Sequence, residues 1–191
     1  MHKKIILAMT GASGMAYGLN LLENLCSHER EVHVIISNAA HKILNLEEKD
    51  HASRLNSAAR IYSEEDIAAP FASGSWTYDS MVVCPCSMAS LSAIANGFGH
   101  NLIHRAADVA LKEKRQLILV PRETPLNRIH LLNMLAAHDA GAAIFPPTPG
   151  FYTGPETIND LIRLFTSRLM DQLGIKNNLA PRWGVEQTKL S

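Results

Sequence analysis

An excess of charge of either sign is missing from this sequence. Its 18 Lys and Arg residues are matched by 18 Asp and Glu residues, so the formal net charge at pH 7 is zero. Proteins that bind nucleic acids or membrane surfaces through their overall field carry an excess of positive charge. We therefore expect no nucleic-acid or membrane function, and any cation in this chain must act locally.

Cysteine and long apolar runs are also scarce. The three cysteines, Cys26, Cys84 and Cys86, are too few and odd in number for a disulfide framework, and Cys-Pro-Cys without a second pair is a poor zinc motif. We interpret them as reduced structural residues and expect no metal site. No stretch approaches the roughly 20 apolar residues of a membrane span, and the first apolar run is too short for a signal peptide. We expect a cytoplasmic protein.

The sequence does contain alternating strand-like and helix-like segments, in a chain of 191 residues of which 47% are hydrophobic. Short apolar runs, typical of buried parallel strands, lie at 5–9, 31–36, 80–84, 117–120 and 142–145, with a weaker one at 59–62. Helix-like segments lie at 14–28, 39–47, 89–95, 102–114, 125–139 and 155–173. This alternation predicts one α/β domain with a doubly wound, Rossmann-like (flavodoxin-like) parallel sheet flanked by helices.

A glycine-rich loop follows the first strand-like run and has the sequence Thr10-Gly11-Ala12-Ser13-Gly14. Its glycines permit positive φ and close backbone approach, so the amides around Ala12 and Ser13 can point at an anion in front of the next helix. A phosphate is the expected guest. Many doubly wound domains use such glycines only to turn the chain, so this loop alone leaves both interpretations open.

Hydroxyl side chains gather where the predicted strands end. Ligands of open α/β sheets bind beyond the carboxyl ends of the strands, where the strand order reverses. If the first strand neighbours the strand at 80–84, the 11–14 and 85–90 loops flank one crevice, and the hydroxyls in question are Thr10, Ser13, Ser37, Ser87 and Ser90. Each serine alone is equally well explained as a helix cap. Five hydroxyls at one edge favour a binding site.

Charged residues form two further groups. Arg105, Asp108 and Lys112 share one face of the 102–114 helix, for which a solvated, salt-bridged surface is the simpler explanation. Arg122-Glu123 follows the 117–120 strand at the edge that carries the serines. Arg binds phosphate oxygens in a fork, and a carboxyl group beside a bound phosphate can act as an acid. This pair therefore predicts a site for a phosphorylated ligand.

Seven motifs lie in order along nearly the whole chain. They are Thr10 to Gly14, Pro70 to Ser75, Cys84-Pro85-Cys86-Ser87, Asn101-Leu102-Ile103 with Arg105 to Lys112, Val120-Pro121-Arg122-Glu123, Pro149-Gly150-Phe151-Tyr152, and Pro181-Arg182-Trp183-Gly184. Together, these motifs resemble the flavin prenyltransferases of the UbiX/Pad1 family.

The resemblance implies an enzyme that transfers a dimethylallyl group from dimethylallyl phosphate to reduced FMN, first to N5 and then by ring closure at C6, without a metal ion. The product, prenylated FMN, would serve a UbiD-type decarboxylase. Members of the family assemble as homo-oligomers, namely dodecamers with sites at subunit contacts. On this basis residues 1–175 form the flavoprotein domain, and the tail at 176–191 packs on a neighbouring subunit.

The resemblance also assigns roles residue by residue. It implies an FMN site made of Gly11, Ala12, Ser13, Ser37, Ser87, Met88, Ala89, Ser90, Arg105 and Arg122. The prenyl phosphate would be held by Lys112, Arg122, Glu123, Tyr152 and Arg168. The catalytic residues would be Ser13, Glu47, Lys112 and Glu123, with apolar walls such as Phe71 excluding water. From the residues alone, Arg168 could reach the crevice if the last helix packs across it, but an ordinary surface arginine is the simpler explanation.

One departure and two alternatives accompany this interpretation. Several members of the family carry a tryptophan where this chain has Ile67, so the support of that ring for a cation is missing and donor preference is open. The related flavin-containing cysteine decarboxylases share the sheet, but we cannot place their catalytic His and substrate clamp in this chain. A flavodoxin-like FMN carrier would need only the Ser and Gly crevice.

Overall fold

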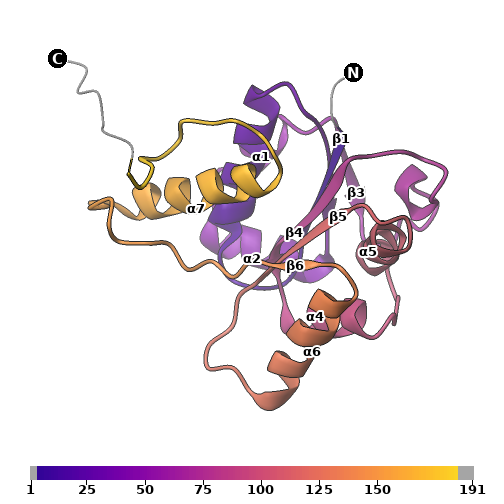
Figure 1. The fold of residues 1–191 in the computed structure, drawn as a ribbon. Coiled ribbons are helices and arrows are strands. Elements are labelled where there is room, and N and C mark those ends of the chain that lie inside the picture. Colours follow the sequence, from indigo (N-terminus) through magenta and orange to yellow (C-terminus); the bar gives the residue numbers. More distant parts are fainter. Residues whose placement is uncertain (1–3, 185–191) are drawn as a thin grey trace. The chain divides into compact units, whose positions relative to one another are not determined.

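The computed structural model describes residues 4–184, and its sheet has six parallel strands in the order β3-β2-β1-β4-β5-β6 (Figure 1). The strands are β1 (Lys4–Met9), β2 (Glu31–Ile36), β3 (Arg60–Ser63), β4 (Ser80–Cys86), β5 (Gln116–Pro121) and β6 (Ala143–Ile144). The strand order reverses between β1 and β4, which pair directly. The predicted doubly wound α/β fold is therefore confirmed, and so is the weak strand at 59–62 as β3.

The helices largely follow the predicted segments, and their capping residues set the limits. They are α1 (Met15–Ser27), α2 (Asn38–Glu47), α3 (His51–Leu55), α4 (Met88–Ala95), α5 (Leu102–Lys112), α6 (Arg128–Asp139) and α7 (Ile158–Gln172). Asn127 and Thr157 accept hydrogen bonds from the third residue of α6 and α7, which is why these helices begin later than predicted. Helix α3 and a 3₁₀ turn at Pro70–Ala72 lie in segments where we expected no regular structure.

One face of the sheet is covered by α1, which contacts β1, β2 and β4. Gly18 makes this packing possible because a Cβ at that position would lie 2.5 Å from the Cys84 carbonyl oxygen. The fixed position of α1 places the loop before it, at 10–14, directly beyond the end of β1.

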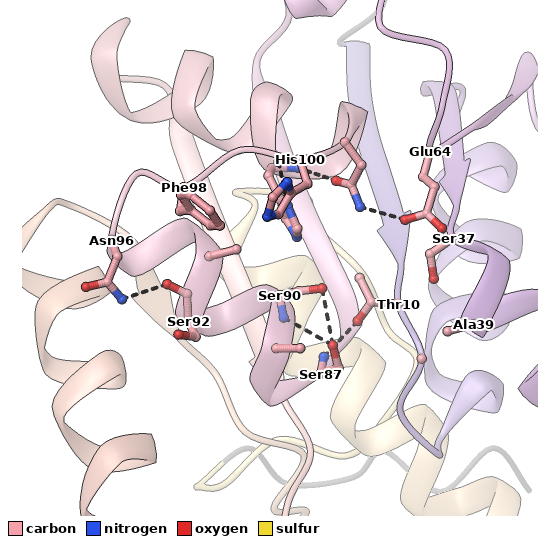
Figure 2. Close-up of a pocket in the computed structure, with 15 residues that line it drawn as sticks. Thr10, Ser37, Ala39, Glu64, Ser87, Ser90, Ser92, Asn96, Phe98 and His100 are labelled. Atoms are coloured by element: carbon pink, nitrogen blue, oxygen red, sulfur yellow. Dashed lines mark hydrogen bonds between the residues drawn. The ribbon is translucent and has the colours of Figure 1, made fainter.

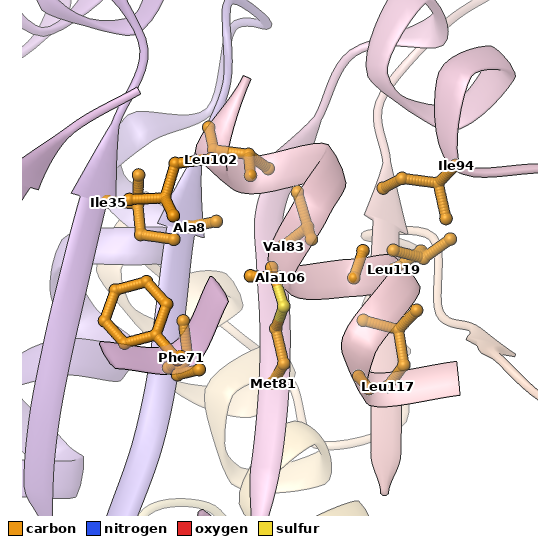
Figure 3. Close-up of a cluster of buried hydrophobic side chains, with 14 of the residues drawn as sticks. Ala8, Ile35, Phe71, Met81, Val83, Ile94, Leu102, Ala106, Leu117 and Leu119 are labelled. Atoms are coloured by element: carbon orange, nitrogen blue, oxygen red, sulfur yellow. The ribbon is translucent and has the colours of Figure 1, made fainter. Parts of the chain in front are cut away.

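The opposite face holds an apolar core beneath α5, as Figure 3 shows. Alternate strand residues such as Ala8, Ile35 and Val83 meet Leu102 and Ala106 of α5, and all are fully buried. Phe71 belongs to this core and is 0% exposed. The expectation that Phe71 forms a wall of the crevice is therefore wrong, since its ring is buried among core side chains.

Helix α6 is unusual because most of its large apolar side chains are exposed. Ile129, Leu131, Leu132 and Leu135, which we call the α6 face, are 65%, 53%, 45% and 55% exposed. Between Arg128 and Asp139 the helix carries no Asp, Glu, Lys or Arg. A helix that is apolar on most sides is ordinarily buried.

The chain divides into two units, the first ending at Pro146 and the second beginning at Pro147, inside the Pro-rich loop. The first contains the whole sheet and the second contains α7. In the second unit, Leu164, Phe165, Leu169 and Met170 are buried along one stripe of α7. The domain limit expected at residue 175 stays a prediction. Within residues 4–184, no helix combines the length and apolar character needed to cross a membrane.

Candidate functional site

The two loops that we expected to flank a crevice are joined by Thr10, which is 1% exposed. Its hydroxyl donates to the Pro85 carbonyl at 3.0 Å and accepts from the Ser87 amide at 2.7 Å, while its own amide donates to Pro85 at 3.1 Å. These bonds hold the end of β1 against the end of β4. The site therefore lies at the point where the strand order reverses, as predicted.

The serines at this edge are both helix caps and pocket walls. Ser37 accepts from the Ala40 amide at 3.0 Å, and Ser87 accepts from the Ser90 amide at 3.3 Å. Figure 2 shows that Ser37, Ser87 and Ser90 also face the same space, with Thr10 between them. The two interpretations of these residues are thus compatible.

The space is a pocket of about 700 Å³. This volume is in the range of cofactor sites, and small side chains of α4, Ala89, Ser92 and Ala93, form one wall. Two amides at the start of α4, those of Met88 and Ala89, have no acceptor among residues 4–184. Together with the nearby hydroxyls, these amides can hold an anion.

The other end of the pocket is formed by residues that sequence reasoning missed. Glu64 accepts from the Asn38 amide at 2.7 Å and from the Asn101 side chain at 2.6 Å, so it ties the start of α2 to the start of α5. His104 lies beside Asn101, and burial together with His100 lowers its pKa, which keeps the ring neutral near pH 7. Of these residues, only Asn101 could be recognised from the sequence, because an asparagine before an apolar helical segment is a typical N-cap.

The amino end of α1 already binds a carboxylate of the chain itself. Glu47 accepts from the amides of Gly14 and Met15 at 2.9 and 3.0 Å, and the Ala12 amide donates to the Thr10 carbonyl. The Ala12, Gly14 and Met15 amides therefore have acceptors within the chain, and the assignment of Gly11, Ala12 and Ser13 to the FMN site stays a prediction. Gly11 still lines the pocket, but the anion at the end of α1 is Glu47.

The charge of Glu47 is stabilised by its surroundings. Partial burial would raise its pKa, but the Ser13 hydroxyl, the Met15 and Gly14 amides and the charge of Arg122 outweigh burial, and the pKa lies below its ordinary value. Ser13 and Glu47, two of the predicted catalytic residues, are thus in contact, with Glu47 as a carboxylate able to accept a proton.

Arg122 and Glu123 lie at the same edge. The Arg122 amide donates to the Cys86 carbonyl at 3.2 Å, and its Nε donates to the Ser13 carbonyl at 3.2 Å. Glu123 is exposed and accepts from the Thr124 amide. No cation within residues 4–184 pairs with Glu123. Glu123 therefore forms no ion pair with Arg122 or Lys112 in the described part of the chain.

Two predicted residues lie elsewhere in the first unit. Arg105 donates to the Ala72 carbonyl and pairs with Asp108 at 2.8 Å, outside the pocket lining. Lys112 ends α5 just before β5 begins, and it pairs with Glu113. Because the strands are parallel, Lys112 lies toward the amino edge of the sheet, opposite to Ser87 and Arg122. One chain does not bring Lys112 to Glu123.

Tyr152 and Arg168 belong to the second unit. The Tyr152 ring meets Trp183 edge-on, with ring centroids 5.2 Å apart, and Arg168 donates to Asp171 at 3.0 Å. In the described part of the tail, 176–184, Arg182 and Trp183 thus make contacts within their own unit, and the remainder at 185–191 lies outside the described residues. Packing of the tail on a neighbour stays a prediction.

The cysteines are free thiols, as expected, and none is exposed. Burial raises the pKa of Cys86 to about 12, and burial together with Cys86 raises that of Cys84 further. Neither thiol is a nucleophile at neutral pH.

Comparison with known proteins identifies the family of this chain. The model of the Flavoprotein family matches residues 1–169. Flavin prenyltransferase UbiX of Methanocaldococcus jannaschii is 50% identical over 183 residues, covering 95% of this chain and 99% of that protein. UbiX of Pseudomonas aeruginosa is 45% identical, covering 96% and 95%. This chain belongs to the UbiX/Pad1 family of flavin prenyltransferases.

Solved structures of this family have the same fold. The structure of AnUbiX (PadA1) with FMN and dimethylallyl pyrophosphate has a TM-score of 0.95 and 42% identity, covering 98% of this chain and 100% of that one. A dodecameric FMN-dependent UbiX-like decarboxylase from Escherichia coli O157:H7 has a TM-score of 0.91 and 42% identity, covering 94% and 98%. Peptidyl-cysteine decarboxylase EpiD is only 18% identical, with a TM-score of 0.61, and shares the fold alone.

Proposed function

We propose that this protein transfers a dimethylallyl group from dimethylallyl phosphate to reduced FMN and thereby makes prenylated FMN. The observation that carries the proposal is the meeting of Ser13, Glu47 and Arg122 beside a hydroxyl-lined pocket, in a chain of the UbiX/Pad1 family. A carrier of FMN would need the pocket but not this proton-accepting and cationic group next to it.

The residues present fit FMN. The pocket combines a wall of small side chains on α4 with the hydroxyls of Ser37, Ser87 and Ser90 and the unused amides of Met88 and Ala89. The wall suits a planar ring, and the polar groups suit a ribityl phosphate. Bound reduced FMN would supply the nucleophilic N5 nitrogen and the C6 carbon at which the new bonds form.

The side chains of the chain would manage charge and protons. Glu47, held as a carboxylate by Ser13, Gly14 and Met15, can accept a proton through the Ser13 hydroxyl. Glu123 can donate a proton to a leaving phosphate, or orient it, because no cation of the described chain holds its carboxylate. Arg122 offers positive charge between the two.

We assign the donor phosphate to Arg168 and Tyr152 of the second unit, together with Lys112, Arg122 and Glu123. The related AnUbiX structure contains a diphosphate, so the donor class is an allylic phosphate, and our choice is the monophosphate. Exposed Ile67 offers no aromatic face to the prenyl chain.

We further propose that the protein works as a homo-oligomer, a dodecamer like its E. coli relative. Lys112 and Arg105 lie away from the pocket in their own chain, so they can serve it only from another copy. The α6 face offers an apolar surface to such a copy. The product would leave for a UbiD-type decarboxylase in the cytoplasm.

The test is anaerobic incubation of the protein with FMN, a reductant and dimethylallyl phosphate, followed by mass spectrometry of the flavin. A flavin heavier by one prenyl unit is expected, and it must be absent without the donor. Release of carbon dioxide from a peptidyl cysteine would instead favour the decarboxylase, and an unchanged flavin would favour the carrier.

A further inference from the structure

The motif Pro181-Arg182-Trp183-Gly184 has no role in the site as described so far, yet Arg182 makes a specific contact in the second unit. Its two terminal nitrogens donate to the two oxygens of Asp171, Nη1 to Oδ2 at 2.9 Å and Nη2 to Oδ1 at 2.8 Å. Nη2 also donates to the Asn177 carbonyl at 2.9 Å. Such a parallel pair is the strongest and most directional form of this interaction.

Asp171 is also the partner of Arg168. Arg168 donates one nitrogen, Nη1, to Oδ2 of Asp171 at 3.0 Å, and its side chain is otherwise 62% exposed. A guanidinium has five N–H donors, so Arg168 keeps most of its donors for another acceptor. The carboxylate, in contrast, is only 20% exposed and receives bonds on both oxygens.

The carboxylate is built into its place by a buried amide. Asn177, which is 6% exposed, donates to Oδ1 of Asp171 at 3.1 Å and to the Ser167 carbonyl at 3.2 Å, and it accepts from the Ser167 hydroxyl at 2.8 Å. Hydrogen bonding to Arg182 is the main reason that the pKa of Asp171 lies below its ordinary value, so it stays ionised. One carboxylate thus faces two arginines, and one positive charge is left over.

The charge of Arg168 can act on an anion only if Arg182 pairs with Asp171 through both of its terminal nitrogens. Without Arg182, Asp171 would keep only the neutral Asn177 amide as a further donor on Oδ1, and both oxygens would have room for Arg168, which lies one helical turn away. Arg168 would then close onto the carboxylate with two nitrogens, and its charge would be cancelled. The next residue, Trp183, contacts the ring of Tyr152, the other residue of this unit assigned to the donor.

We propose that Arg182 is a positioning residue which occupies Asp171 so that Arg168 keeps its free donors and its charge for the phosphate of the prenyl donor. This proposal rests on the proposed function, in which Arg168 binds that phosphate. Arg182 itself does not touch the substrate.

The test compares Arg182→Met, Arg182→Lys, Arg168→Met and the double variants Asp171→Asn/Arg182→Met and Arg168→Met/Arg182→Met in the FMN-loaded protein. The readouts are KM for dimethylallyl phosphate, kcat, inhibition by inorganic phosphate and affinity for FMN. We expect Arg182→Met to raise the donor KM and the phosphate inhibition constant about tenfold, with kcat and FMN affinity within about twofold. Arg182→Lys, which keeps the charge but loses the fork, should fall between. Arg163→Met, on the same helix and exposed, is the matched control and should match the wild type.

Removal of the competing carboxylate decides the question. Asp171→Asn added to Arg182→Met should bring KM back to within about threefold of the wild type, because the neutral amide no longer cancels the charge of Arg168. Arg182→Met added to Arg168→Met should change KM no further. The proposal would be overturned if the changes in KM of the single variants multiplied in either double variant, or if Arg168→Met left KM unchanged. Neither result would affect the proposed function, which rests on prenyl transfer by the wild type. If Arg182→Met does not fold, Arg182→Lys and the double variant with Asp171→Asn carry the same comparison.

Discussion

Thr10→Val tests whether one buried hydroxyl holds the pocket together. Valine keeps the shape of threonine but can neither donate to the Pro85 carbonyl nor accept from the Ser87 amide. The carbonyl keeps the Thr10 amide as a donor at 3.1 Å, whereas the Ser87 amide has no other acceptor among the described residues. A buried N–H without an acceptor costs about 1–3 kcal/mol, and the lost bond adds about 1 kcal/mol.

The added methyl returns about 1 kcal/mol by apolar burial, so the free energy of unfolding should fall by about 1–3 kcal/mol. With a denaturant slope of about 2 kcal/mol per M, the urea midpoint should fall by about 1 M. Binding of FMN should weaken as well, because the Ser87 amide directs the cap of α4.

Thr124→Val is the matched control. Thr124 is exposed, and its hydroxyl has no partner among residues 4–184, so the same chemical change there should stay within about 0.5 kcal/mol. Both variants are unfolded in urea at one protein concentration and followed by circular dichroism. A Thr10→Val protein as stable as Thr124→Val would refute the argument that this hydroxyl joins β1 to β4.

Three further predictions concern the ligand and the carboxylates. FMN should bind far more tightly than riboflavin, since the serines and the free α4 amides act on the phosphate; equal affinities by calorimetry would contradict this assignment. Glu123→Gln should slow anaerobic single-turnover transfer by about 10²–10⁴-fold with unchanged FMN affinity, whereas a normal rate with weakened FMN binding would make Glu123 structural. Because the pKa of Glu47 is lowered in the folded protein, its carboxylate stabilises the fold above the unfolded pKa of about 4.3, and this contribution is lost as pH falls through the folded pKa. The stability difference between wild type and Glu47→Gln should therefore be constant near neutral pH and shrink in acid; a difference independent of pH would argue against an ionised Glu47.

Much of the fold could be predicted from the sequence because local sequence patterns determine where the strands and helices lie. The apolar runs and the capping residues Asn127 and Thr157 carry enough local information to place elements to within a few residues. The serine cluster could also be predicted, because parallel strands bring their carboxyl ends to one edge whichever strands are neighbours.

The remaining parts of the site depend on contacts between distant residues. Glu47 binds the amides of Gly14 and Met15, and Glu64 joins α2 to α5. These residues are far apart in the sequence, and no local pattern indicates that they meet. Lys112 was assigned to the site by the resemblance alone, because helical periodicity gives the face of a helix but not the edge of the sheet at which the helix ends. Pairing of Arg182 with Asp171 likewise needs the turn after α7.

The exposed apolar side chains of α6 have a consequence for how stability must be measured. If the α6 face is covered only in the assembly, part of the free energy that holds each chain folded comes from its neighbours and depends on mass action. Melting temperature should then rise with protein concentration, and dilution alone should favour unfolding. For such a chain, a free energy of unfolding has meaning only when the concentration is stated with it.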